Sequence, residues 1–543
     1  MPYDPLVDTE RRPRPQLPAE IDRPLLETIN QMRHAPIWQT PETPTFPKAI
    51  NIRRVPSAPG AGRRPACSSR PKTSILLSVS WRTALAVAAG KAAGAASRRL
   101  GRGGGTAIVG LVAQRLDPAL VDHLATQLGH GSILITGTNG KTTTARMVSA
   151  IAREAGLRPL PNPSGSNLMR GVATALVEEA SGGRVRSAPE RLGVFEVDEA
   201  VLPHAAAAVR PRAVAFTNLF RDQLDRYGEV DTVADLWRRA LSALLPSTAV
   251  VLNADDPAVA SLAAAAPGPV LLYGVDDPSV SQEGPEHASD FRWCLACGEE
   301  LAYHAAFYGH VGHWYCPACR SARLTPDVRA THVELRPSGG TALSLATPAG
   351  EFSLELPLAG LYNVYNALAA VACGLALEAP LEAAVRALAG FSAAFGRQEV
   401  FDVEGRRVEV LLGKNPTGLN EVLRTIAARE GPKHLLLFLN DGIADGRDVS
   451  WIWDADYEIM AGRAASLVVA GSRAEDLALR LKYAGFGSEV PAVSRTDQAL
   501  SAALAATPEG ETLYVVPTYT AMLEVRELLA RRGHRPHYWE EGL

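Results

Sequence analysis

The chain contains little cysteine, little net charge and no long apolar run, and each of these absences excludes a class of protein. Six cysteines in 543 residues exclude a small scaffold held together by disulfides. A formal net charge of −3 gives no overall field that would attract nucleic acid or an anionic membrane. No apolar run reaches the roughly 18 residues that a membrane-spanning helix needs, since Arg82 and Lys91 interrupt the best stretch, 74–96. We expect that stretch to form an amphipathic helix on the following domain, and the lack of an export signal leads us to expect a cytoplasmic protein.

Changes in composition along the chain predict its domain organisation. Residues 1–73 hold 14 of the 39 prolines and show little periodicity, so we expect a disordered Pro/Arg-rich extension. After residue 74, short apolar stretches alternate with Ala/Leu-rich stretches, which is typical of βαβ units and a parallel sheet. We predict a central α/β domain over 74–396, a cysteine-bearing insert over 290–322 and a C-terminal α/β domain over 397–543.

Local patterns predict some elements of these domains. Residues 331–357 alternate apolar and polar side chains around Gly-Gly and Pro-Ala-Gly turns, which predicts a β-meander. A helix is expected next, over 363–376. Beyond Gly396, four apolar stretches (VEVLL, HLLLFLN, SLVVAG and TLYVVP) predict the strands of the C-terminal domain.

A candidate phosphate site lies at 131–144, where GSILITGTNGKTTT joins an apolar strand, a glycine-containing turn and a helix start. Glycines allow backbone N–H groups to curl round a phosphate, and the helix N-terminus adds partial positive charge. In such a turn a lysine reaches the β- and γ-phosphates and a threonine hydroxyl binds Mg²⁺. The spacing departs from the usual P-loop, because Ile135 occupies the position of its first glycine. The residues expected to bind a nucleoside triphosphate are Gly137, Thr138, Asn139, Gly140, Lys141, Thr142 and Thr143.

Acidic and amide side chains close three later apolar stretches. The segment 195–199 (FEVDE) ends one strand, at the edge where parallel-sheet sites lie, and a carboxylate there can hold Mg²⁺. The segments 217–225 (TNLFRDQLD) and 253–256 (NADD) end two others, and the side chains of the second suit adenine and ribose hydroxyls. For these segments a solvated helix start, or capping of the next helix, is the alternative interpretation.

Four cysteines form two C-x-x-C pairs, Cys294 with Cys297 and Cys316 with Cys319, separated by 18 residues. Each pair lies on a tight turn (CLACG, CPACR), so four thiolates can converge on Zn²⁺ in a tetrahedron. Protein atoms would fill every coordination position, which indicates a structural zinc. The histidines between the pairs are expected to be surface or packing residues: His304, His310 and His313.

The motifs GTNGKTTT, EVDEA, TNLFRDQLD, LNADD and GLYNVYNALAA occur in an order that resembles the Mur ligase family. Members of that family use ATP to activate a carboxylate as an acyl phosphate. The resemblance covers 100–397, and the cysteine ribbon with the C-terminal motifs KNP and DGRDVSWIWD extends it to 76–543 and to the branch that amidates lipid II. It implies ATP and Mg²⁺ as cofactors, D-glutamate of the lipid II stem peptide as substrate and D-isoglutamine as product. It also implies a GatD-type glutamine amidotransferase subunit as the ammonia source, and action at the inner face of the plasma membrane.

The resemblance also assigns individual residues. Lys141 and Glu196 match catalytic positions, and Thr142 and Glu196 match the Mg²⁺ positions. An aspartate of the C-terminal domain is implied to reach the glutaminase and orient its histidine. We place it at Asp454, with Asp448 as the alternative and helix capping as the competing interpretation. The further positions that match nucleotide-binding residues of the family are Asn253, Asp256, Asn363, Asn366 and Arg397.

The chain departs from the amino-acid-adding members of the family at three places. Their Asp-His-Leu-Asp is DQLD at 222–225, so an imidazole metal ligand is lost. The stretch 235–239 (DLWRR) contains no lysine that could be carbamoylated for a second Mg²⁺, and arginine cannot replace it. Their Asp-His-Asn-Pro-type stretch is GKNP at 413–416, where Lys414 and Asn415 are candidates for binding the substrate carboxylate or a phosphate. These departures put the second Mg²⁺ in doubt and suit ammonia as the nucleophile.

Two other functions remain as alternatives. One is a Mur or folylpolyglutamate-type ligase that adds an amino acid, which the lost histidine and lysine and the ribbon disfavour. The other is a non-catalytic, nucleotide-gated scaffold, which the intact Lys141, Thr142 and Glu196 disfavour. Nucleic-acid binding is not expected, because the ribbon carries few basic residues. The sequence has no Cys-His glutaminase motif of its own, so glutamine as nitrogen donor requires a separate subunit.

Overall fold

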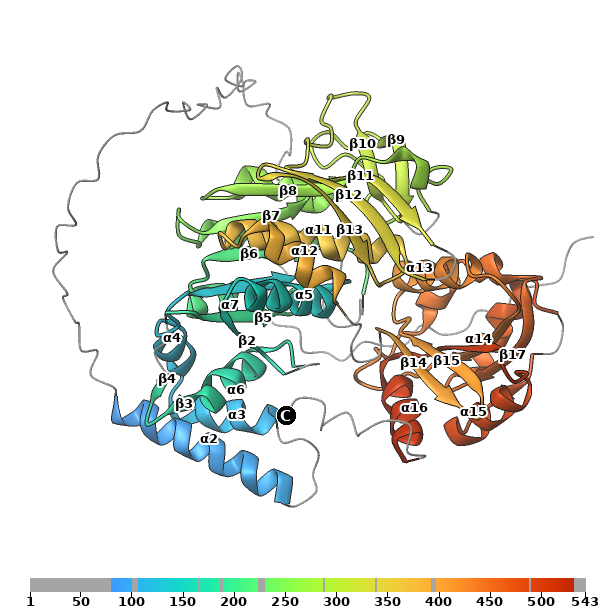
Figure 1. Ribbon diagram of the computed structural model, residues 1–543, viewed down its shortest axis with the longest axis horizontal. Helices are drawn as coiled ribbons and strands as arrows, with labels where there is room; N and C mark the ends of the chain where they lie inside the picture. Colours follow the sequence, from blue (N-terminus) through green and yellow to red (C-terminus); the bar gives the residue numbers. More distant parts are fainter. Residues whose placement is uncertain are drawn as a thin grey trace, which may run out of the picture. The chain divides into compact units, whose positions relative to one another are not determined.

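The architecture is given by a computed structural model, which describes most of the chain after residue 79 (Figure 1). All described residues belong to a unit spanning 76–543. The predicted extension, 1–73, lies outside the described residues. In the part of the chain that is described, no helix has the length and apolar character needed to cross a bilayer. The described ranges are 80–99, 106–163, 166–185, 189–222, 230–286, 289–336, 339–391, 397–487 and 490–531.

A nine-stranded sheet with the order β13-β12-β11-β8-β7-β6-β1-β5-β2 organises the first two thirds of the chain. Neighbouring strands run parallel from β2 to β11, and β12 and β13 extend the sheet as an antiparallel meander. This confirms the predicted parallel α/β fold. The strands are β1 (Ser132–Thr136), β2 (Arg158–Pro161), β5 (Arg191–Glu196), β6 (Ala213–Phe216), β7 (Ala249–Asn253), β8 (Val270–Val275), β11 (Val328–Leu335), β12 (Thr341–Thr347) and β13 (Gly350–Leu356).

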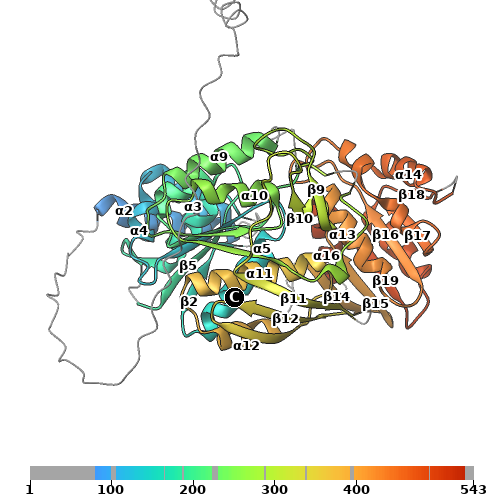
Figure 2. The same cartoon turned by 90° about the horizontal axis from the view of Figure 1, so that it is seen from above.

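Helices cover both faces of this sheet (Figure 2). On β1, Ile133 and Ile135 pack into a core with α5, α11 and α12, whereas Leu134 packs into a second core on the other face. This alternation follows from the two-residue period of a strand. The helices are α2 (Trp81–Arg99), α3 (Thr106–Leu116), α4 (Leu120–Ala125), α5 (Lys141–Glu154), α6 (Met169–Glu179), α7 (Leu202–Val209), α9 (Val230–Ser242), α10 (Pro257–Ser261), α11 (Leu361–Ala376) and α12 (Leu381–Ala389), with short 3₁₀ turns at Leu262–Ala265 and Pro278–Val280.

The cysteine-bearing insert contains an antiparallel hairpin of β9 (Ala302–Tyr308) and β10 (Val311–Tyr315). One C-x-x-C pair precedes β9 and the other follows β10. Because an antiparallel hairpin returns the chain to its starting point, the two pairs meet at the same end. A second small hairpin joins β3 (Ala180–Ser181) to β4 (Arg184–Val185).

A six-stranded sheet with the order β14-β15-β19-β16-β17-β18 organises the remaining described residues. Its strands are parallel except for β14, which forms an antiparallel hairpin with β15. The four predicted strands are present, and β14 and β18 were not predicted. The elements are β14 (Arg397–Val403), β15 (Arg406–Leu411), α13 (Pro416–Ala427), β16 (Lys433–Phe438), the 3₁₀ turns η3 (Ser450–Asp454) and η4 (Tyr457–Met460), β17 (Ala464–Ala470), α14 (Ala474–Tyr483), β18 (Ala492–Val493), α15 (Thr496–Ala505), β19 (Thr512–Val516) and α16 (Tyr519–Arg531).

Candidate active site

The turn between β1 and α5 has the shape of a phosphate-binding loop. Gly137 and Gly140 have φ angles of +129° and +85°, a region that favours glycine. A Cβ atom on Gly140 would overlap the side-chain oxygen of Asn366, so the loop also depends on the absence of a side chain. Helix α5 begins directly at Lys141 and directs its partially positive N-terminus toward the loop.

The segment that follows β6 braces this loop. The N–H of Thr138 donates to the carbonyl of Asn218 at 2.9 Å. The N–H of Asn139 donates to the side-chain oxygen of Asn218 at 2.8 Å, and the Thr138 hydroxyl donates to the carbonyl of Phe220 at 3.0 Å. The TNLF motif therefore supports the loop from the neighbouring strand. Within TNLFRDQLD, residues 223–225 lie outside the described part.

A buried ion pair lies at the base of the loop. The Lys141 ammonium donates to Glu199 at 2.8 Å, and also to the carbonyl oxygens of Gly137 and Thr138. Burial alone would lower the pKa of Lys141, but the facing carboxylates, above all Glu199, outweigh it and hold this pKa above its ordinary value. Lys141 is therefore protonated, which is the form that a phosphate requires.

The acidic strand end contributes differently from the prediction, which selected Glu196. Glu196 ends β5, and its backbone forms two hydrogen bonds with the side chain of Asn162, of 2.9 and 3.0 Å. Its partly buried carboxylate contributes to the charge around Lys141, whereas Glu199 is the acid that contacts the lysine. Thr142 is partly buried at the start of α5, and the side chain of Thr143 is buried. The predicted segment FEVDE includes Glu199, and the expectation selected Glu196 within it.

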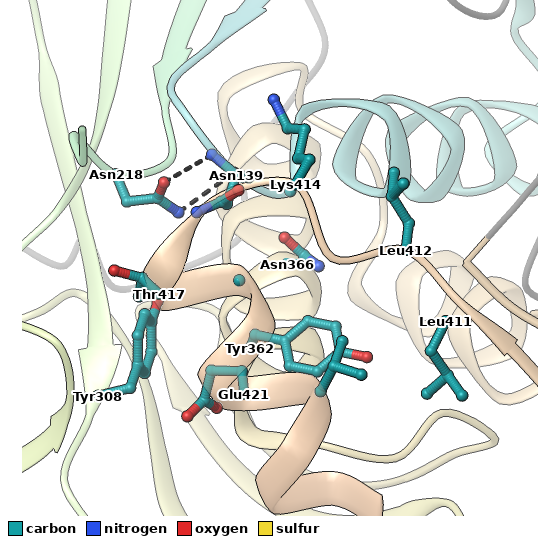
Figure 3. Close-up of a pocket in the computed structure, with 13 residues that line it drawn as sticks. Asn139, Asn218, Tyr308, Tyr362, Asn366, Leu411, Leu412, Lys414, Thr417 and Glu421 are labelled. Carbon is teal, nitrogen blue, oxygen red and sulfur yellow. Dashed lines mark hydrogen bonds between the residues drawn. The ribbon is translucent and has the colours of Figure 1, made fainter. Parts of the chain in front are cut away.

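The loop forms one wall of a cavity of about 730 Å³, its open mouth included (Figure 3). The other walls come from α11, from the hairpin residue Tyr308, and from β15 and α13 of the C-terminal sheet. Lys414 lines the cavity and forms an ion pair with Asp222. The cavity thus brings the predicted phosphate loop and the predicted GKNP segment together.

Three predicted amide side chains lie beside the loop. Asn366 lines the cavity, and its side-chain oxygen accepts a hydrogen bond from the Thr144 hydroxyl at 3.3 Å. Asn363 orients Asn366 through a hydrogen bond of 3.1 Å. Asn415 caps α13 and exchanges hydrogen bonds with Asn139, at 3.0 Å in one direction and 3.4 Å in the other. The loop is therefore in direct contact with the C-terminal domain.

Asn253 and Asp256, which were predicted to bind the nucleotide, are both fully buried, and neither lines the cavity. Asn253 donates to the carbonyl of Thr217 at 3.1 Å and accepts from the N–H of Asp255 at 3.0 Å. Asp256 accepts from the N–H of Leu219 at 2.8 Å and caps α10. The structure thus gives them bracing and capping contacts at the strand ends, as in the alternative interpretation.

A buried cluster missed by sequence reasoning lies at the wall formed by α13. Glu421 lines the cavity and accepts a hydrogen bond from Arg424 at 2.8 Å. Arg424 also pairs with Glu286, which accepts from the N–H of Gly309 at 2.9 Å and from the Asn420 amide at 2.8 Å. Burial raises the pKa of Glu421 to about 7; Arg424 opposes this shift and the Glu286 carboxylate adds to it. The cluster joins the cysteine-bearing insert to α13.

The four predicted cysteines are brought together. All four sulfur atoms lie within 4.8 Å of one another, with Sγ–Sγ distances of 3.5 Å for Cys294 with Cys319 and 3.4 Å for Cys297 with Cys316. Four converging sulfurs form a site that could hold a metal ion, and all-thiolate donor sets suit zinc. The histidines between them are used elsewhere: His310 is fully buried between aromatic rings, and His313 hydrogen-bonds a backbone carbonyl.

The two aspartates predicted to serve the partner glutaminase, Asp454 and Asp448, do not line the cavity. Asp454 ends η3, does not line the cavity, has a side chain that is 44% exposed, and lies 3.5 Å from the guanidinium of Arg221. Hydrogen bonds from Ser450, first from its side chain and then from its backbone N–H, lower the pKa of Asp448. Arg397 begins β14, and its side chain lies outside the described part.

Two family models match separate parts of the chain. The family model described as the Mur ligase middle domain matches residues 135–311, and the model described as MurT ligase C-terminal matches residues 412–522. The first match contains the phosphate loop and most of the cysteine-bearing insert up to β10, and the second contains the GKNP segment from Gly413 and the aspartates Asp448 and Asp454.

Individual proteins resemble the chain over most of its length. The MurT subunit of lipid II isoglutaminyl synthase (glutamine-hydrolyzing) from Streptococcus pneumoniae is 33% identical over 458 residues, which is 83% of this chain and 98% of that protein. The subunit of the same name from Staphylococcus aureus is 31% identical over 81% of this chain and 96% of its own length. Among solved structures, a pseudomurein peptide ligase type C from Methanothermus fervidus has a TM-score of 0.57 at 22% identity, covering 74% of this chain and 79% of its own. MurF from Acinetobacter baumannii has a TM-score of 0.56 at 21% identity, with 77% and 80% covered. The solved structures establish the fold alone.

Proposed function

This chain belongs to the MurT family of Mur ligases, and from that premise we propose that it is the ATP-dependent synthetase subunit of a lipid II isoglutaminyl synthase. Its substrate is then the lipid II stem peptide, in which the α-carboxylate of D-glutamate becomes a carboxamide. The observation that carries the proposal is that the phosphate loop and the C-terminal domain line one shared cavity. Phosphoryl transfer depends on holding donor and acceptor together, and such a cavity can do so.

The reaction has two steps. A carboxylate oxygen attacks the γ-phosphorus of ATP, the bond from that phosphorus to the bridging oxygen breaks, and ADP leaves. Ammonia then attacks the acyl carbon, loses one proton, and expels inorganic phosphate. Negative charge accumulates on phosphate oxygens in the first step, so pre-placed positive charge is the largest aid the protein can offer.

The loop residues fit a triphosphate. The glycine-dependent turn, the N-terminus of α5 and the protonated Lys141 all offer positive charge or N–H donors to it. Thr142 and Glu196 would supply the oxygen ligands that Mg²⁺ prefers, and Mg²⁺ when bound neutralises phosphate charge. The asparagine pair, Asn363 and Asn366, supports nucleotide binding because Asn366 faces the cavity. Arg397 is retained as a nucleotide-binding candidate.

The C-terminal domain supports ammonia as the nucleophile. Lys414 lines the cavity where amino-acid-adding ligases carry a different motif, and its charge suits an acidic substrate. The ammonia is proposed to come from a GatD-type glutaminase subunit. An exposed Asp454 can orient the histidine of that partner by accepting its ring N–H. The four-cysteine site is proposed to hold a structural Zn²⁺, and the reaction to take place at the cytoplasmic face of the membrane.

A reconstituted assay tests this function. The chain, purified with a GatD-type partner, is incubated with lipid II, ATP, Mg²⁺ and either glutamine or ammonium. We expect ADP release and conversion of one carboxyl group of the stem peptide to a carboxamide, measured by mass spectrometry. Incorporation of an amino acid would instead support the ligase alternative, and neither ADP nor carboxamide would refute the proposal.

A further inference from the structure

Exposed apolar side chains gather on the two N-terminal helices, α2 and α3. Five of the fifteen large apolar side chains that are exposed among the described residues lie there, although the two helices contain only 19 and 11 residues. On α2 they are Trp81, 73% exposed, and Leu85, 52% exposed. On α3 they are Ile108, Leu111 and Leu116. This concentration is unlike that of scattered surface leucines, which need no explanation.

The exposed residues of α2 follow the helical period. Exposed positions recur at intervals of three or four residues, which places them on one face, while a set of small residues faces the protein. Gly90 and Gly94 allow α3 to approach, because a Cβ atom at Gly90 would lie 2.9 Å from the carbonyl of Val109. Helices α2 and α3 thus lie side by side (Figures 1 and 2), and each exposes large apolar side chains. The exposed residues of the α2 face are Trp81, Leu85, Ala88, Ala92 and Ala96.

The charge on these helices has one sign. Both helices lack aspartate and glutamate, although the whole chain has a net charge of −3. Lys91 donates to the carbonyl of Ala180 at 2.5 Å, and the four arginines are exposed. None of these arginines forms an ion pair within the described residues. The basic residues are Arg82, Lys91, Arg98, Arg99 and Arg115.

The helix pair is linked to the active site through α6. Helix α3 packs against the start of α6, where a Cβ atom on Gly110 would overlap the carbonyl of Arg170. The loop before α6 reaches the acidic strand end, because Asn162 bonds to the backbone of Glu196 and the carbonyl of Asn167 accepts from Asp198 at 2.9 Å. One helix and one loop therefore separate the exposed face from the residues around Lys141.

We propose that the outer face of α2 and α3 docks this protein on an anionic lipid bilayer and so holds the active site where its substrate is embedded. This inference rests on the proposed function, since a lipid-linked substrate lies in such a bilayer. An apolar stripe with tryptophan and leucine inserts at the headgroup boundary, and exposed arginines attract anionic lipid. A second copy of the chain is disfavoured as occupant, because two faces of like charge would repel.

Vesicle sedimentation of the full chain with its partner tests the docking surface. The face variant is Leu85→Ser/Leu111→Ser, and the matched control is Leu245→Ser/Leu324→Ser, at positions of similar exposure on other elements. We expect wild type and control to bind phosphatidylglycerol vesicles, and the face variant to bind at least tenfold more weakly. A charge variant, Arg82→Gln/Arg115→Gln, should also bind more weakly, and added salt should weaken wild-type binding. Equal binding by all variants, or no binding by wild type, would overturn the proposal.

An activity assay distinguishes failure of the docking proposal from failure of the proposed function. With lipid II in anionic vesicles, amidation by the face variant should fall in proportion to its binding. With lipid II in detergent micelles, the face variant and wild type should be equally active. Loss in both formats would mean that the face is structural and would overturn the docking proposal. If wild type amidates in neither format, the proposed function fails, and the sedimentation result still decides the docking surface. If a variant lacking residues 1–79 binds vesicles and the full chain does not, that segment covers the face and the docking proposal is overturned.

Discussion

The buried pair of Lys141 and Glu199 determines how the phosphate loop can be tested. Lys141→Met should reduce ADP release by about 10²-fold or more, because the main cation of the loop is lost. The same change leaves Glu199 buried without its partner, which should lower the free energy of unfolding by about 3–5 kcal/mol. The double variant Lys141→Met/Glu199→Gln should recover most of that stability and none of the activity. Denaturant titration and an ADP assay measure the two effects, and an active Lys141→Met variant would contradict the assignment.

Glu421 should make stability depend on pH. Its pKa in the folded protein, about 7, exceeds its ordinary value of 4.5, so the folded state binds the proton more tightly than the unfolded state does. Stability should therefore fall as the pH rises from 4.5 to about 7, by roughly 3 kcal/mol from this group. Glu421→Gln should remove that part of the slope in urea titrations. An exposed control, Glu334→Gln, should keep the wild-type slope, and an unchanged slope in Glu421→Gln would contradict the prediction.

At the scale of single residues, sequence patterns indicate the segments of a candidate site and do not determine which side chain faces which partner. The sequence predicts FEVDE as an acidic strand end. The strand ends at Glu196, and the conformation of the loop that follows it brings Glu199 to Lys141. Asn253 and Asp256 were assigned to the nucleotide from their motif, whereas the structure turns them toward the backbone of the neighbouring strand end. Polar residues at strand ends can bind a ligand or brace the neighbouring backbone, and sequence spacing does not distinguish these two roles.

At the scale of elements, the four-cysteine site should hold the insert together. Cys294→Ser should release about one zinc ion per chain, since structural zinc sites supply much of the folding free energy of small modules. The hairpin of β9 and β10 should then become sensitive to limited proteolysis. Cys373→Ala is the matched control, because that thiol is buried in α11 far from the cluster and its burial raises its pKa. Metal analysis that finds no zinc in the wild type would contradict the prediction.

Elements were predictable where their pattern was strong. The meander and α11 follow from clear alternation and from an Ala-rich run, and the structure contains both. β14, with the sequence RQEVFDV, was missed because it is an edge strand whose charged residues mask the alternation. β18 contains two residues, too few for any pattern. Such elements form because a neighbouring strand offers them a partner.

At the scale of the whole complex, Asp454 should matter for one nitrogen source only. Asp454→Asn should lower glutamine-driven amidation by about 10²-fold or more, because the partner's histidine loses the carboxylate that orients it. Amidation with added ammonium should be unchanged, since Asp454 does not line the cavity. Asp448→Asn is the control at the alternative position. If both nitrogen sources are affected equally, Asp454 belongs to the synthetase site or to the fold.

The arrangement of the two sheets around one cavity could not be predicted from the sequence. Asn139 and Asn415 are 276 residues apart, and no local pattern relates them. The same holds for Glu286 and Arg424, which join the segment before the insert to α13. Family resemblance predicted that both segments serve ATP or substrate, but their contact depends on packing between domains.

The mutual hydrogen bonds of Asn139 and Asn415 join the phosphate loop to the C-terminal domain beside the cavity. Neutral amide bonds contribute only about 1 kcal/mol each, so ordinary thermal motion can undo them. A nucleotide that hydrogen-bonds to the same amides would have to compete with this pair, while the Lys414–Asp222 and Arg424–Glu286 ion pairs would still join the two domains.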